Sequence, residues 1–148
     1  MNYINPPPTP SAAITQCNEA QHAQGSGQPN CCANPGACNK PGEPDFSFYG
    51  FTFKTQPPIL RWSEIKTQVG CLKVPVAFTR RKPDGSAHMM VIVGYATDSQ
   101  GVPLLLINDP WPVNAGQLTW IPYSAYNPTI GGDHWVSENY YNVTYGGP

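Results

Sequence analysis

Two residues in the second half of the chain have the side chains and the surroundings that proton transfer requires. His88 lies at the start of the apolar run Ala87–Tyr95, directly after the small residues Gly85-Ser-Ala. A histidine at a strand edge can offer one ring nitrogen to a reaction centre while an acceptor holds the other nitrogen and fixes the tautomer. Asp109 ends the next apolar run and supplies such an acceptor. The pair is a candidate general base with its orienting acid; the alternative is a core histidine and an aspartate that caps a turn.

The elements around these residues predict that they are neighbours. The link Thr97–Gly101 is short and rich in turn residues, so the two apolar runs are expected to be adjacent antiparallel strands. The start of one strand then lies beside the end of the next. Because side chains alternate between the faces of a strand, only one of Asn108 and Asp109 can reach His88.

The remaining patterns predict an N-terminal helical part followed by an antiparallel sheet, which is an α+β domain. Helices are expected over 14–23 and 60–70; the second has Trp62, Ile65 and Val69 on its inward face and Gly70 at its end. A short strand or an aromatic loop is expected over 46–53. The clearer strands, in a meander, are predicted over 74–79, 87–95, 104–108, 117–122 and 134–145.

The cysteines are unevenly distributed, and this distribution favours disulfide bonds. Four of the five lie in a short stretch rich in Gly, Pro and Asn: Cys17, Cys31, Cys32 and Cys38. Such crowding on loops is typical of disulfides, although four cysteines allow three pairings. A zinc site with His22 as an added ligand is the rival interpretation, but the spacing differs from that of the usual ligand pairs. The remaining Cys71 is expected to be a free thiol, buried and inert.

Length and composition limit the possible classes of function. The 148 residues are expected to form one domain over 14–148, preceded by a flexible Pro-rich arm over 1–13. The net charge of −1 and the lack of long basic runs argue against a nucleic-acid partner. No apolar run is long enough to span a bilayer. We expect neither a cofactor nor a metal. The N-terminus does not resemble a signal peptide, so the cysteines alone indicate a secreted protein or another oxidising compartment.

The motif Gly-x-x-His-x-x-Val-Ile-x-Gly-Tyr at 85–95, followed by Asp-Pro-Trp at 109–111, resembles the C-terminal half of small bacterial papain-like cysteine peptidases, including effector proteases of plant pathogens. The cysteine cluster and the tail Trp120-Ile-Pro-Tyr123 occur in the order those proteins show, so the resemblance covers roughly residues 15 to 145. It implies a papain-like fold, His88 as general base, Asp109 as orienting acid, and a peptide or protein substrate.

The chain departs from the family at the nucleophile, which those peptidases carry in a Cys-Trp-Ala-Ala type motif at the start of a long helix. No Cys-Trp pair occurs in this sequence. Three explanations stay open. The nucleophile helix is missing or comes from another chain. Alternatively, Cys17, near the start of the first predicted helix, has taken its place. Or the domain is a non-catalytic module that binds proteins or has a structural role, with aromatic residues such as Trp62, Trp111, Trp120 and Trp135 making the contacts.

Overall fold

The computed structural model describes residues 16–25, 30–38, 45–56, 59–112, 115–126 and 133–146. The predicted arm over 1–13 lies outside these residues. The described residues belong to two compact units, one formed by residues 52–144 and the other by the segments on either side of them. We call these the sheet unit and the cysteine unit, and we describe each by itself.

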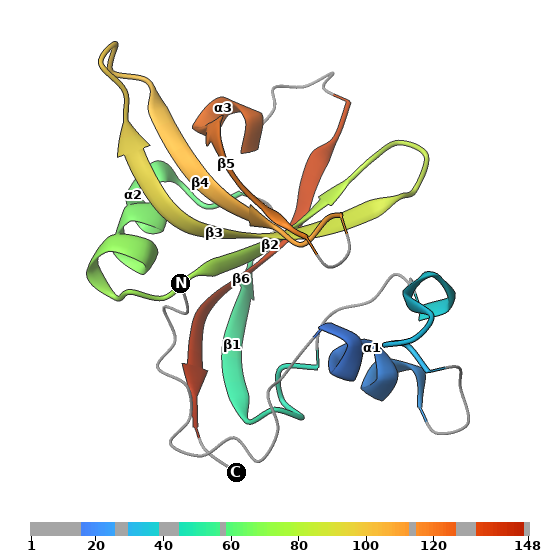
Figure 1. The fold of residues 1–148 in the computed structure, drawn as a ribbon. Helices are drawn as coiled ribbons and strands as arrows, with labels where there is room; N and C mark the ends of the chain where they lie inside the picture. Colours follow the sequence, from blue (N-terminus) through green and yellow to red (C-terminus); the bar gives the residue numbers. More distant parts are fainter. Residues whose placement is uncertain are drawn as a thin grey trace. The chain divides into compact units, whose positions relative to one another are not determined.

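A six-stranded, largely antiparallel sheet is the main feature of the sheet unit (Figure 1), with strand order β1-β6-β2-β3-β4-β5. This architecture with few short helices is compatible with the predicted α+β class. The strands are β1 Phe51–Gln56, β2 Val76–Arg81, β3 Ala87–Thr97, β4 Pro103–Asp109, β5 Gln117–Pro122 and β6 Trp135–Tyr145.

Strands β2 to β5 form the predicted meander, since each pairs antiparallel with its successor in sequence. The meander does not extend to the last strand. β6 pairs with β2 rather than with β5, which leaves β5 at the edge of the sheet. The prediction that the meander includes the last strand was therefore wrong. The physical reason is burial: Val136 lies opposite Arg80 and Asn139 lies opposite Phe78, and both are buried. They extend the buried face of the sheet beyond β2.

Short helices contribute to the core on one face of this sheet. α2 (Trp62–Ile65) continues into the π-helix η2 (Lys66–Cys71), and α3 (Tyr123–Tyr126) follows β5. The predicted inward face of the first of these helices is confirmed: Ile65 is fully buried, and Trp62 and Val69 pack against the core. The buried core residues of the sheet unit are Leu60, Ile65, Val76, Phe78, Met90, Ile92, Leu105, Ile107, Tyr126 and Val136.

The sequence predicted that the helix would end at Gly70, but it continues for one more residue. The helical segment runs through Cys71, and the constraint on Gly70 is a close approach: a Cβ atom there would lie 2.5 Å from the hydroxyl of Tyr95. Sequence patterning could not separate the two roles, because a glycine at the end of an apolar repeat is also what a helix stop looks like.

Tyr126 connects three parts of the sheet unit through its buried hydroxyl group. The hydroxyl donates to Asn139 Oδ1 at 2.5 Å and accepts the backbone N–H of Leu60 at 3.1 Å. The hydroxyl of the neighbouring Tyr123 donates to the carbonyl oxygen of Leu60 at 2.8 Å. Both backbone groups of Leu60 are thus bonded to α3, which fixes the entry to α2. Burial raises the pKa of Tyr126 well above its ordinary value.

The two ends of the sheet unit lie next to each other. The hydroxyl oxygens of Thr52 in β1 and Thr144 in β6 are 2.7 Å apart. The chain therefore enters and leaves this unit at nearly the same point. None of the helices within the described ranges is long and apolar enough to cross a membrane.

The cysteine unit contains α1 (Gln16–Gln24) and the short 3-10 helix η1 (Pro35–Cys38). The stretch of Gly, Pro and Asn residues that carries the cysteines thus includes one helical turn. A disulfide joins Cys31 to Cys38, and Gln21 of α1 accepts the backbone N–H of Cys31 at 3.0 Å. The disulfide closes the loop on itself, and the hydrogen bond to Gln21 ties the loop to α1.

Replacing Tyr126 with Phe removes one hydroxyl and with it two buried hydrogen bonds, one to Asn139 Oδ1 and one from the backbone N–H of Leu60. We expect the free energy of unfolding to fall by about 1–3 kcal/mol. The shift of the midpoint in urea at unchanged slope measures this change. The half-exposed Tyr95→Phe is the matched control, and an equal loss in both variants would contradict the role assigned to the Tyr126 hydroxyl.

The raised pKa of Tyr126 also predicts how stability depends on pH. Above the ordinary tyrosine pKa of 10.0 the unfolded chain loses this proton while the folded chain keeps it. The folded state then binds more protons, so stability falls as the pH rises, by up to about 1.4 kcal/mol per pH unit for one group. Unfolding in urea across the alkaline range should show a shallower decline for Tyr126→Phe than for the wild type. If the free energy of unfolding falls equally with pH in both proteins, Tyr126 is not the group responsible.

Candidate functional site

His88 and Asp109 form a hydrogen-bonded pair at one end of the sheet. His88 Nε2 lies 2.7 Å from Asp109 Oδ1. An ionised carboxylate only accepts hydrogen bonds, so Nε2 carries the hydrogen and Nδ1 is the basic nitrogen of the neutral ring. The His88 side chain is 41% exposed, whereas that of Asp109 is 20% exposed. The arrangement is a partly exposed imidazole that is held through one ring nitrogen, and among the described residues the other nitrogen, Nδ1, makes no hydrogen bond.

Strand alternation selects Asp109 over Asn108, as expected. Asn108 is exposed and lies between Val91 of β3 and Leu118 of β5 on the face opposite the core. Asp109, one residue later, turns its carboxylate toward His88. The same oxygen also accepts the backbone N–H of Trp111 at 2.8 Å. Two donors on one oxygen restrict the carboxylate, and they connect the turn after β4 to the orientation of the imidazole.

Arg80 is a third charged residue at this end of the sheet, directly opposite His88 in the β2–β3 register. Burial lowers the pKa of its guanidinium, while the nearby charges of Asp133 and Asp109 oppose that shift. Its Nε atom is buried without a hydrogen-bond partner among the residues that the structure describes. In sequence Arg80 is simply the start of a basic triplet. The signal that finds it is the alternation of Val76, Phe78 and Arg80 on one face of β2.

No thiol of the sheet unit lies near this pair. Cys71 is the sole cysteine between residues 52 and 144; it is free, as expected, but exposed, so the prediction that it is buried was wrong. Its neighbour Gly70 packs against Tyr95, which is seven residues along β3 from His88. At about 3.3 Å per residue of strand, this separation is roughly 23 Å. Cys71 and His88 are therefore at opposite ends of β3, and Cys71 cannot act as a nucleophile for this base.

The cysteine cluster is at least partly oxidised. Cys31 and Cys38 are bonded to each other, and Cys32 is disulfide-bonded as well. The disulfides exclude these cysteines as zinc ligands, and no set of three or more metal-binding side chains gathers elsewhere in the described ranges. Cys17 belongs to α1, but its side chain lies outside the described residues. The Cys31–Cys38 disulfide is weakly compatible with an oxidising compartment.

The other two histidines have local partners. His22 stacks on Phe48 with ring centroids 3.5 Å apart, and its Nε2 lies 3.2 Å from Asp45. His134 Nδ1 lies 2.5 Å from Asp133, and its Nε2 lies 3.1 Å from the carbonyl oxygen of Ala125. Each contact is typical of a histidine with a packing or surface role.

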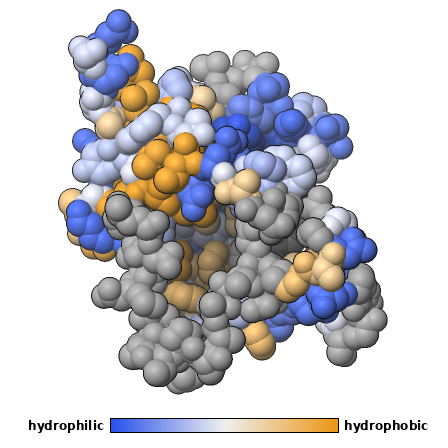
Figure 2. All heavy atoms as spheres, viewed as in Figure 1, coloured by the Kyte–Doolittle hydropathy of each residue, from blue (hydrophilic) through white to orange (hydrophobic). Residues whose placement is uncertain are grey.

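Large apolar side chains are exposed on the edge strand β5. Leu118 is 61% exposed and Trp120 is 49% exposed, and the register places both on the face opposite the core. Trp111 and Trp135 are also exposed. Figure 2 shows further hydrophobic surface where Figure 1 draws β3 and β4. The sheet unit therefore has substantial apolar surface besides the histidine site.

No protein-family model matches this chain, and neither does any curated protein or solved structure. A function for this site must therefore be inferred from its geometry and chemistry alone.

The hydrogen bond to Asp109 predicts the tautomer of His88. In the neutral imidazole we expect hydrogen on Nε2 and none on Nδ1, which long-range proton–nitrogen NMR correlations distinguish. Replacing Asp109 with Ala should remove this preference, since the acceptor is lost. Asp133→Ala, which removes a carboxylate bonded to another histidine, is the control. A His88 tautomer unchanged in Asp109→Ala would contradict the pairing.

Proposed function

We propose that this chain is a papain-like cysteine-peptidase-type protein in which the sheet unit supplies the base and the acid. The observation that carries this proposal is the His88–Asp109 pair, with Nε2 bonded to the carboxylate and Nδ1 open. A thiol peptidase needs this division of roles: one ring nitrogen accepts the proton of the thiol while the other is held. The sequence motifs around both residues support the same assignment.

The chemistry would proceed through a thioester. His88 Nδ1 takes the proton of a cysteine thiol, and the thiolate attacks the carbonyl carbon of a peptide bond. The imidazolium then gives its proton to the leaving amine as the C–N bond breaks. Water, deprotonated by His88, attacks the thioester and releases the acid and the thiol. Asp109 stabilises the imidazolium in both halves, and it stays ionised throughout.

The thiolate must come from outside the sheet unit, because Cys71 is at the wrong end of β3. Two sources fit this requirement. One is Cys17 after reduction of the disulfides; it lies in the first turn of α1, where a helix dipole favours a thiolate. The other is a segment or a separate chain that carries the nucleophile helix of the family. Without either source the scaffold is catalytically inactive.

A second candidate function is a non-catalytic module that binds another protein. The observation that favours it is the exposure of Leu118 and Trp120 on an edge strand. Large exposed apolar side chains that gather on one surface are typical of protein interfaces. On this proposal the His88–Asp109 pair is only a structural contact at the end of the sheet.

The two sources of the thiolate can be separated by covalent trapping. The reduced full chain is incubated with a peptide vinyl sulfone and labelled residues are identified by mass spectrometry. If Cys17 is the nucleophile, we expect one label on Cys17 and a loss of about 10²-fold or more in labelling rate in His88→Ala, the usual contribution of a positioned base. Cys71→Ser is the matched control and should label at the wild-type rate.

Other outcomes of this experiment have defined meanings. Labelling of Cys71 alone, or labelling that is as fast in His88→Ala, would contradict a role for His88 as the base. Absence of labelling in a folded sample would exclude Cys17. Peptide hydrolysis restored by adding a separate peptide that contains a Cys-Trp-Ala-Ala helix would then support a split site. If the added peptide does not produce hydrolysis either, the peptidase proposal is rejected and the protein-binding module is the remaining candidate.

A further inference from the structure

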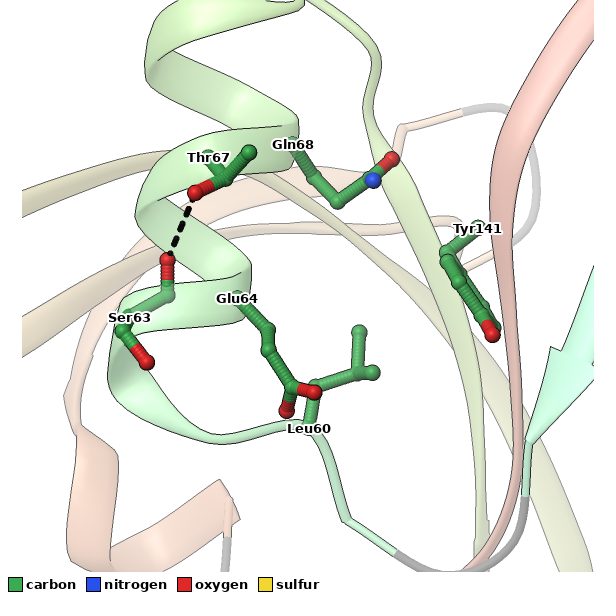
Figure 3. A pocket seen from close by; sticks show the side chains of 6 residues that line it. All are labelled: Leu60, Ser63, Glu64, Thr67, Gln68 and Tyr141. Atoms are coloured by element: carbon green, nitrogen blue, oxygen red, sulfur yellow. Dashed lines mark hydrogen bonds between the residues drawn. The ribbon is translucent and has the colours of Figure 1, made fainter.

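A cavity of about 240 Å³ lies between the helical segment α2–η2 and strand β6, on a part of the sheet unit that the histidine site does not use. Its position follows from the register: Tyr141 comes after Tyr140, which pairs with Ala77, whereas His88 pairs with Arg80 three residues farther along β2. Figure 3 shows its lining. The lining residues are Leu60, Ser63, Glu64, Thr67, Gln68 and Tyr141.

Hydrogen bonds fix most of the walls of this cavity. Gln68 is buried; its Oε1 accepts the backbone N–H of Asn142 at 3.0 Å, and its Nε2 donates to the side-chain oxygen of Asn142 at 2.5 Å. Thr67 Oγ1 donates to the carbonyl oxygen of Ser63 at 3.0 Å. Leu60 is held through both of its backbone groups by α3. A cavity with fixed walls needs little ordering when a ligand enters.

Glu64 gives the cavity its charge. It is the sole ionisable acid in the lining, and Figure 3 shows it on one side of the cavity with Tyr141 on the other and Leu60 between them. One carboxylate oxygen, Oε2, accepts the backbone N–H of Arg61 at 2.6 Å. The ion pairs found among the described residues all involve histidines, so Glu64 has no cationic partner there. A half-buried carboxylate of this kind favours a cation as its ligand.

We propose that this cavity binds a primary ammonium group on an unbranched apolar stem, the chemistry of a lysine side chain. The volume is below the roughly 300–1,000 Å³ of sites for drug-sized ligands, so it suits one side chain. The stem lies along the Tyr141 ring, and the ammonium reaches Glu64 and the Tyr141 hydroxyl. Because Arg61 already occupies Oε2, a compact ammonium fits better than the two-pronged guanidinium of arginine.

The test is a titration of the nitrogen-15-labelled full chain followed by proton–nitrogen NMR. The main ligand is Nα-acetyl-lysine N-methylamide, which represents a lysine within a peptide; butylamine represents a free amine. We expect saturable shifts confined to the amides of 60–68 and 140–142, with a dissociation constant in the millimolar range. The norleucine analogue, which lacks the charge, and the arginine analogue should each bind about tenfold more weakly or worse.

Variants of the lining provide the decisive control. Glu64→Gln keeps an oxygen to accept the Arg61 N–H but removes the charge, so the fold persists and lysine affinity should fall about tenfold or more. Glu138→Gln, the same change on the opposite face of β6, should leave affinity unchanged. Tyr141→Phe should weaken binding to a smaller degree.

Each outcome decides the proposal. Binding of both amines, or of one, supports the site and tells a peptide lysine from a free amine as its source. Shifts that do not saturate, equal binding of the norleucine or arginine analogue, or unchanged affinity in a folded Glu64→Gln protein would each overturn it.

Discussion

The antiparallel pairing of β3 with its neighbours determines which side chains meet in the sheet unit. Adjacent residues of a strand point to opposite faces, so a register shift of one residue would exchange the members of the histidine site for their neighbours. His88 would then turn away from the core side, and Asn108 would replace Asp109. The register is held by buried apolar pairs such as Ile92 with Ile107 and Met90 with Phe78. The packing of the core and the geometry of the charged site are therefore consequences of one alignment.

Much of this arrangement could be predicted from the sequence because it depends on local patterns. Alternation and apolar runs located the strands from residue 74 onward, and short turns predicted the contact between His88 and Asp109. The place of β6 beside β2 could not be predicted in this way, since a long connection leaves the choice of partner to tertiary packing. Arg80 was missed because it lies one residue past the strand predicted over 74–79, whereas β2 continues to Arg81.

The His88–Asp109 pair alone does not determine whether the protein is reactive, because a reaction of this type also needs a nucleophile. The geometry of His88 and Asp109 defines which nitrogen is basic and how its ring is held, and both features belong to the sheet unit alone. Reactivity depends in addition on a thiolate, and the position of Cys71 at the far end of β3 excludes the one cysteine of this unit. The hydrogen-bonded pair is thus encoded separately from any thiol, so its geometry alone does not establish activity.

The contact between Thr52 and Thr144 has a consequence for how this architecture could be rearranged. A unit whose two ends meet can be grafted into a surface loop of an unrelated host without stretching either protein, and its own ends can be joined and new ones opened at an exposed turn. The tip of the β3–β4 hairpin, at residues 98–101, is such a turn. The sheet unit could therefore be transferred as a whole: its residues are contiguous in sequence, its two ends lie side by side, and its histidine site lies wholly within it.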